Sequence, residues 1–209
     1  MRVEDDLELR NLFLRAITKS EERQGIHMSD LDYCLREAYF RKLHPQPATE
    51  AELGYFVDGA ARHLVLQSLH PGKAEVQASK WCLTGTVDLL GDRPIEIKTT
   101  RTRTGQINPH FFERLCRYCI LHDVDSGSLI VQFLNMRDNP WVFKRVVFAP
   151  DELDWQKQEM LRRRDLLAEA LRHRNPMDLP VFADAFDKQN PRWKCRDCTY
   201  RSQCEESDR

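Results

Sequence analysis

The alternation of helix-like and strand-like segments is the feature that most restricts the folds open to this chain. In the first third, apolar residues recur every three or four positions, as on one helix face, whereas after Pro71-Gly72 the period becomes two. The helices predicted in this way cover residues 4–23, about 30–43 with Ser29 or Asp30 as the cap, 51–69, 108–122 and 150–174, and the segment after 175 is expected to be irregular. The predicted strands cover residues 74–81, 83–90, 94–99, 128–135 and 141–148. This order predicts an α/β fold in which helices flank a central mixed sheet.

Length and composition indicate a single domain without disulfide cross-links. The 209 residues suffice for one core, and the 7 cysteines are too few, and odd in number, for a disulfide scaffold. No apolar run approaches the roughly 20 residues of a bilayer-spanning helix, and the acidic start does not resemble a signal peptide. We therefore expect one domain over residues 1–209, located in the cytoplasm, with no membrane partner.

Charge and motif content restrict nucleic-acid binding to a local surface and exclude one class of ATPase. The net charge of -1 indicates no global field for a polyanion, so any nucleic-acid contact must be local. The chain contains no Gly-x-x-x-x-Gly-Lys-Ser/Thr loop, which excludes a built-in P-loop ATPase.

Two carboxylates and a lysine are expected to converge where strands 83–90 and 94–99 form a hairpin. Alternation places Glu96 and Lys98 on one side of their strand, and pairing brings Asp88 beside Glu96, with the backbone oxygen of Ile97 close by. Adjacent carboxylates repel each other unless a divalent cation lies between them, and Mg2+ or Mn2+ suits such oxygen ligands. The metal would activate water and Lys98 would offset charge, which indicates phosphodiester hydrolysis. The same spacing is also typical of a surface hairpin with a weak Glu96–Lys98 ion pair.

His63 adds a nitrogen donor from the 51–69 helix, just ahead of the sheet. A lone helix histidine is commonly a core or surface residue, but beside the hairpin carboxylates it becomes a candidate ligand that favours manganese somewhat over magnesium. The same helix contains Gly54 and Gly59. Each is less favourable than alanine in a helix interior by about 1 kcal/mol, which indicates a close approach to the backbone there or a later helix start.

A second cluster, near the C-terminus, has the spacing of a metal site. It consists of Cys195, Cys198 and Cys204. Three thiolates need a fourth ligand to complete a zinc or an iron–sulfur site, and the spacing does not choose between these two cofactors.

The candidates for the fourth ligand are Cys34, Cys82, Cys116 and Cys119. One alternative is a zinc site made by the pair Cys116 and Cys119 with the pair Cys195 and Cys198. Cys116 and Cys119 lie on the apolar stripe of their helix, however, and are expected to be buried there. Cys82 is also expected in the core. Cys34 is favoured, because the nearby cations Arg36, Arg41 and Lys42 create an electropositive setting that stabilises a thiolate.

Taken together, these motifs resemble those of the RecB-like PD-(D/E)xK nucleases. More closely, the chain is similar to the compact CRISPR-associated exonucleases with a four-cysteine 4Fe-4S cluster, the fourth family of CRISPR-associated proteins. The resemblance covers residues 29–204. Its motifs stand in the expected order, and they are Cys34-Leu35-Arg36-Glu37-Ala38-Tyr39-Phe40, Gly59 to His63, Gly85-Thr86-Val87-Asp88, Pro94-Ile95-Glu96-Ile97-Lys98-Thr99 and the three terminal cysteines.

The resemblance implies a restriction-endonuclease-like core over about residues 51–150 and an iron–sulfur region made by about 29–47 and 184–209. It implies metal ligands at His63, Asp88 and Glu96, and a catalytic lysine at Lys98. It further implies that a mainly structural 4Fe-4S cluster joins the N-terminal helix to the C-terminal tail, held by Cys34, Cys195, Cys198 and Cys204.

Substrate contacts are expected from side chains beside these motifs. Arg101 and Arg103 closely follow Lys98 and are placed to grip phosphates next to the scissile one. Tyr118 lies off the apolar stripe of the 108–122 helix and is expected to face the site. The chain departs from the family at Arg114, where a glutamine usually precedes this tyrosine, and at Leu35, where proline usually follows the first cysteine.

The function implied is that of an Mg2+- or Mn2+-dependent DNA exonuclease acting on single-stranded ends or overhangs. Its implied pathway is the processing of spacer precursors in CRISPR adaptation, with DNA and the CRISPR integrase complex as partners. The alternatives are a RecB-like repair or viral nuclease outside CRISPR, a non-catalytic DNA-end-binding subunit with a vestigial site, and a zinc-ribbon interaction module.

Overall fold

The computed structural model describes residues 7–8, 12, 24–102, 105–138, 140–183, 192–196 and 198–207. Most of the predicted 4–23 helix therefore lies outside the described residues, as does Arg103.

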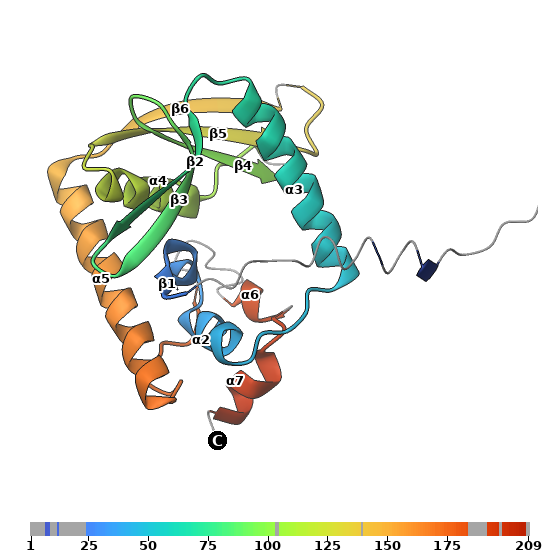
Figure 1. Cartoon of the computed structure of the whole chain (residues 1–209), viewed down its shortest axis with the longest axis vertical. Helices are drawn as coiled ribbons and strands as arrows, with labels where there is room; N and C mark the ends of the chain where they lie inside the picture. The colour runs from blue at the N-terminus through green and yellow to red at the C-terminus, as the bar shows by residue number, and fades with distance from the viewer. Residues whose placement is uncertain are drawn as a thin grey trace, which may run out of the picture.

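A mixed β-sheet forms the centre of the molecule, as predicted (Figure 1). Its strand order is β1-β3-β4-β5-β6, and β2 pairs with β3 off this path. The β4–β5 and β1–β3 pairs are parallel, and the remaining pairs are antiparallel. The strands are β1 (Ile26–His27), β2 (Lys73–Lys80), β3 (Leu83–Leu90), β4 (Pro94–Thr100), β5 (Ser126–Phe133) and β6 (Trp141–Val147).

Helices flank this sheet, and local signals in the sequence account for where they begin. Thr49 and Glu52 form a capping box at the start of α3, Asn108 caps α4 ahead of Pro109, and Pro150 occupies the first turn of α5. The helices are η1 (Met28–Leu31), α2 (Leu35–Leu43), α3 (Glu50–Ser68), α4 (Pro109–Leu121), α5 (Pro150–His173), α6 (Trp193–Arg196) and α7 (Arg201–Ser207).

Most of the core lies on the side of the sheet that α4, α5 and α2 cover. Leu115 and Cys119 of α4 pack there with Leu129 and Val131 of β5 and with Leu167 of α5. A smaller cluster lies on the α3 side, where Leu66 contacts the buried residues Leu89, Ile95 and Ile97.

Helix α3 is thinly packed against the sheet. Only Leu53 and Gln67 are buried among its residues, all of which the structure describes. Polar bonds tether the helix instead: Arg62 donates to the Gln132 side chain at 3.3 Å, and Gln67 donates to the backbone oxygen of Asp88 at 3.0 Å. These bonds hold α3 over the region where β3 and β4 separate.

Three sequence-based predictions are wrong in detail. Ser29 and Asp30 do not cap the following helix, because α2 begins at Leu35 with Cys34 as its N-cap. Both residues lie within η1, where Asp30 accepts the His27 N–H and pairs with Lys42 and Arg41. The tail after residue 175 is not wholly irregular, since it contains α6 and α7.

The third concerns Cys82, which is exposed and not in the core. It lies in the two-residue turn between β2 and β3, where Trp81 and Cys82 have φ angles of 52° and 57°. A tight hairpin turn commonly requires positive φ at both central residues, which directs these side chains away from the sheet.

No helix in the described ranges is long and apolar enough to cross a membrane.

Candidate active site

The separation of β3 from β4 creates the candidate site. The two strands pair through Leu90↔Pro94 and Leu89↔Ile95 beside their turn, and within the described sheet no further pair joins them. At the next position the Asp88 carboxylate takes the place of a strand bond, because its Oδ2 accepts the Ile97 N–H at 2.6 Å. The Asp88 carboxylate therefore contacts the Ile97 backbone, whereas Glu96 is not part of a three-ligand group within 4.8 Å among the described residues.

Helix α3 adds His63 to this place, as predicted. Its Nδ1 lies 3.4 Å from Asp88 Oδ1. The hydrogen bond to Asp88 raises the pKa of His63, although burial opposes the shift. Burial acts to raise the pKa of Asp88, but the contacts with His63, Lys98 and the Ile97 N–H together lower it. Asp88 is thus held as an anion that accepts two partners.

Glu75 of β2 is a third member that the sequence analysis missed. Ligand atoms of His63, Glu75 and Asp88 all lie within 4.8 Å of one another. Gln67 Nε2 donates to Glu75 Oε1 at 2.5 Å, and Glu75 has a φ of 52°. The β2–β3 register, which pairs Ala74↔Leu89 and Val76↔Val87, places Glu75 across from Asp88.

Glu96 of β4 is fully buried at 1% exposure. Its Oε1 forms an ion pair with Lys98 and lies 3.5 Å from Arg114 Nε, whereas its Oε2 has no hydrogen-bond partner among the described residues. Burial raises the pKa of Glu96, and the nearby Asp88 acts in the same direction. A buried carboxylate oxygen without a partner is costly, and a cation would supply the missing interaction.

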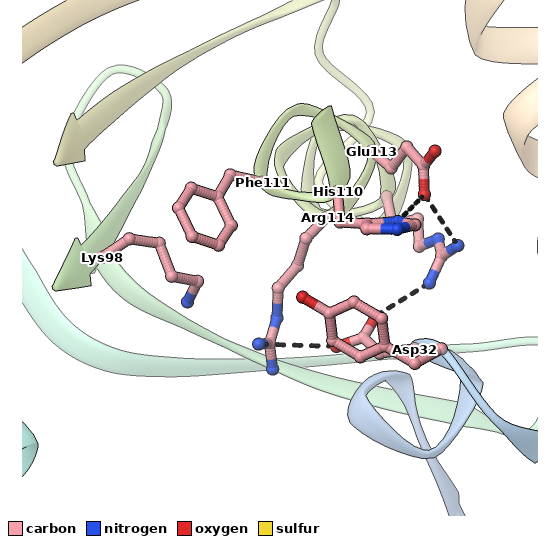
Figure 2. A pocket seen from close by; sticks show the side chains of 8 residues that line it. Asp32, Lys98, His110, Phe111, Glu113 and Arg114 are labelled. Atoms are coloured by element: carbon pink, nitrogen blue, oxygen red, sulfur yellow. Dashed lines mark hydrogen bonds and ion pairs between the residues drawn. The ribbon is translucent and has the colours of Figure 1, made fainter. Parts of the chain in front are cut away.

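Lys98 and Arg114 face a common pocket of about 30 Å³, which has room for roughly one or two water molecules (Figure 2). Figure 2 shows Phe111 beside Lys98 and the contact from Arg114 to Asp32, whose Nη1 and Oδ2 atoms are 3.4 Å apart. The Lys98 Nζ also donates to the backbone oxygen of Ile97 at 3.4 Å. The ammonium thus lies between the buried carboxylate and a space of water size.

Tyr118 is buried on α4 one turn after Arg114. Burial raises the pKa of Tyr118, the Glu96 charge adds to this effect, and the Arg114 charge acts to lower that pKa. Burial acts to lower the pKa of Arg114, but Asp32, Glu96 and Tyr118 more than offset it and raise it. The prediction that Tyr118 lies off the apolar stripe of its helix is therefore wrong, because the residue belongs to the hydrophobic core and does not offer an exposed ring.

Arg101 lies just after β4, with its side chain half exposed. Its guanidinium carbon lies 4.6 Å from the centre of the Tyr55 ring, and its Nη2 lies 3.8 Å from Asp58 Oδ2. Arg101 is therefore near α3, as a phosphate contact beside the site requires. Arg103 is outside the described residues.

The four predicted cluster cysteines line one cavity of about 270 Å³ between α2 and the C-terminal helices. Within the described chain, no three of the sulfurs of Cys34, Cys195, Cys198 and Cys204 lie within 4.8 Å of one another. Four thiolates around one zinc ion would lie about 3.8 Å apart, given a Zn–S bond of about 2.3 Å. The sulfurs therefore share a cavity without being closed around a single ion.

One expectation about the cysteines is wrong, and one alternative for the metal site fails for the reason expected from the sequence. Arg41 and Lys42 pair with Asp30, so they do not surround Cys34, and burial raises the pKa of its thiol. Arg36 does line the cavity, and its Nη1 lies 3.7 Å from Cys204 Sγ. The zinc alternative with Cys116 and Cys119 also fails, because both are buried in the core on α4, and burial raises the pKa of each thiol to about 12.

The Glu75→Gln variant tests whether the missed carboxylate belongs to the cation site. The substitution removes one negative charge beside His63 and Asp88 and leaves the shape of the side chain unchanged. We expect Mn2+ binding, measured by titration calorimetry, to weaken by about tenfold. The matched control is Glu169→Gln, which alters an exposed carboxylate on α5 that pairs with Arg172. Equal Mn2+ affinity in the Glu75 variant and the wild type would remove Glu75 from the site.

Solved structures with the same fold were found by comparison of coordinates. The crystal structure of SSO0001 matches with a TM-score of 0.66 and 18% identity, covering 95% of this chain and 96% of that chain. LHK-Exo in complex with dAMP, an alkaline exonuclease from Laribacter hongkongensis, matches with a TM-score of 0.51 and 13% identity, covering 78% of this chain and 95% of that chain. No protein-family model and no curated protein sequence matches. The chain therefore has an exonuclease-like α/β fold.

Proposed function

We propose that this protein is a metal-dependent DNA exonuclease that hydrolyses phosphodiesters at single-stranded ends or overhangs. The observation that carries the proposal is the convergence of His63, Asp88 and Glu75 at the point where β3 and β4 separate, next to Glu96 and Lys98. The fold shared with an alkaline exonuclease supports the same reaction class. The fold alone would not decide the chemistry, because one fold carries many functions.

The donor set fits Mg2+ or Mn2+. Carboxylate oxygens suit both ions, and the His63 imidazole favours Mn2+ somewhat. His63, Asp88 and Glu96 would hold the ion, with Glu75 and the Ile97 carbonyl close by. The Oε2 atom of the buried Glu96, for which the described part of the chain offers no hydrogen-bond partner, is the feature that most calls for a cation. When bound, such an ion polarises a phosphodiester and lowers the pKa of a water ligand.

The protein side chains position the reactants. Lys98 Nζ, at the edge of the water-sized pocket, holds a water by hydrogen bonding and offsets negative charge that develops on the phosphate. Arg114 fixes Glu96 from the other side and is itself fixed by Asp32. Asp88 orients His63 through their contact, and Gln67 orients Glu75. Most of the groups around the reaction centre are therefore held before substrate arrives.

We further propose that Cys34, Cys195, Cys198 and Cys204 hold a 4Fe-4S cluster. A cubane cluster is larger than a zinc ion and holds its thiolates farther apart, which agrees with four sulfurs that line one cavity without closing on a point. The Arg36 guanidinium beside Cys204 would offset the negative charge of the thiolates. The cluster would tie α2 to α6 and α7, which lie near one another in Figure 1.

The pathway is a finer part of the same proposal. Processing of spacer precursors in CRISPR adaptation, with the integrase complex as partner, rests on the sequence resemblance given above, and a repair or viral nuclease would use the same site. One observation favours the rival role of a non-catalytic DNA-end-binding subunit: Arg114 replaces the family glutamine and lies 3.5 Å from Glu96, where it competes with a cation for that carboxylate.

Cleavage of end-labelled single- and double-stranded DNA tests the proposed activity. The wild type, purified without oxygen, is incubated with Mn2+, Mg2+ or EDTA beside the Glu96→Ala variant. We expect digestion of single-stranded ends with either metal, none with EDTA and none by the variant. Undiminished digestion by the variant would refute this site, and a folded wild type without activity would favour the end-binding role.

A further inference from the structure

Helix α3 carries a row of side chains that leads to the candidate active site. Tyr55, Gly59, His63 and Gln67 follow one another at intervals of four residues and therefore occupy neighbouring turns of one helix face. Gln67 and His63 contact Asp88. Going toward the start of the helix, the row continues with the gap at Gly59 and the ring of Tyr55, about 12 Å from His63 along the axis.

Neither conformation nor packing within the chain requires glycine at position 59. The residue is helical without a positive φ, and a Cβ added there would meet no atom within 4 Å. Glycine nonetheless destabilises a helix interior relative to alanine by about 1 kcal/mol. The helix also starts before both glycines, at Glu50, so the later start considered above does not apply. The open space beside Gly59 leaves room for a ligand one turn from His63, whereas Gly54, which is equally open, lies nine residues from His63.

The Tyr55 ring next to this gap has the surroundings of a base-stacking site. It is 57% exposed, and Arg101 lies over it at 4.6 Å. Arg101 directly follows β4, the strand that supplies Glu96 and Lys98, and its Nη2 also lies 3.8 Å from Asp58 Oδ2. An aromatic ring beside a cation binds single-stranded nucleic acid by stacking on a base and pairing with a phosphate.

We propose that Tyr55, Gly59 and Arg101 form a nucleotide subsite next to the scissile phosphate. The substrate backbone passes over Gly59. The base next to the scissile phosphate stacks on Tyr55, and Arg101 pairs with a phosphate beside that base. This inference rests on the proposed function. It also deepens that function, because a ring that stacks on one base and a cation that pairs with the neighbouring phosphate suit a single strand.

The test compares leucine substitutions at two glycines of the same helix. Gly59→Leu fills the proposed path, whereas Gly54→Leu, five residues away, places the same side chain in open space on another face. Leucine favours a helix over glycine, so both variants should melt at or above the wild-type temperature. We expect Gly59→Leu to weaken binding of a fluorescent single-stranded oligonucleotide by at least tenfold in anisotropy titrations with Ca2+, and Gly54→Leu to bind like the wild type.

Tyr55 is tested in the same titration. Tyr55→Ala should weaken binding by about tenfold, and Tyr55→Phe, which keeps the ring, should bind like the wild type. Mn2+ affinity should be unchanged in every variant, as expected for a substrate subsite and not a metal ligand. Wild-type binding by Gly59→Leu, or an equal loss in Gly54→Leu, would overturn the inference. Because binding is read without cleavage, an inactive wild type that still shows this pattern would refute the exonuclease and leave the subsite standing.

Discussion

Replacing Lys98 by methionine is expected to lower the rate of DNA digestion by about a hundredfold to a thousandfold. The ammonium lies at the edge of the water-sized pocket, and it pairs with the buried Glu96. Methionine has a similar length and packs in the same space, but it neither holds a water nor offsets charge on a phosphate. The rate is measured as product released from end-labelled single-stranded DNA at saturating Mn2+.

The matched control for this variant is Lys144→Met, which alters an exposed lysine on β6, beyond β5 from the site. It should digest DNA at the wild-type rate. Mn2+ binding by the Lys98 variant should persist, because its proposed ligands are unchanged. If Lys98→Met retains more than a tenth of wild-type activity while Mn2+ stays bound, the lysine does not act in the chemical step.

The Cys34→Ser substitution is expected to remove iron and stability together. Loss of one of four ligands should deplete the bound iron, bleach absorption near 400 nm and lower the melting temperature by about 10 °C. The structure separates a ligand role from a capping role by the direction in which the melting temperature changes. Cys34 is the N-cap of α2 and accepts the Glu37 N–H at 3.4 Å, and serine is the better cap of the two. A cysteine with only a capping role would therefore be replaced without loss.

Cys82→Ser is the control, because Cys82 is exposed in the β2–β3 turn, far along the chain from the cavity. Its iron content and melting temperature should equal those of the wild type. A Cys34→Ser protein with wild-type iron and melting temperature would exclude Cys34 as a ligand. Zinc in place of iron in the purified wild type would support the alternative of a zinc-ribbon interaction module.

The sheet and the central pair of carboxylates could be predicted from the sequence because they depend on local patterns. The period of two fixed the bounds of β3 exactly as predicted, and hairpin pairing placed Asp88 beside the β4 motif. The change in the spacing of apolar residues, between two and about 3.6, also allowed α4 and α5 to be distinguished from the neighbouring strands in the sequence.

Features that depend on backbone conformation or distant partners could not be predicted in this way. The turn at Trp81-Cys82 has positive φ at residue types that rarely adopt it, so Cys82 was placed in the core. Glu75 was missed because its role depends on the register which that turn sets and on Gln67 of α3. Arg41 and Lys42 were assigned to Cys34 because they are close to it in sequence. In the folded chain, both form ion pairs with Asp30.

The measurement that most directly tests the account is the position of Mn2+ in crystals of the wild-type protein, found by anomalous diffraction. We expect one strong peak within bonding distance of His63, Asp88 and Glu96, with the Glu96 Oε2 atom, which has no partner among the described residues, as a ligand. We also expect the peak to disappear in crystals of Glu96→Ala. A protein that digests DNA with Mn2+ but shows no peak among these three residues would contradict the account.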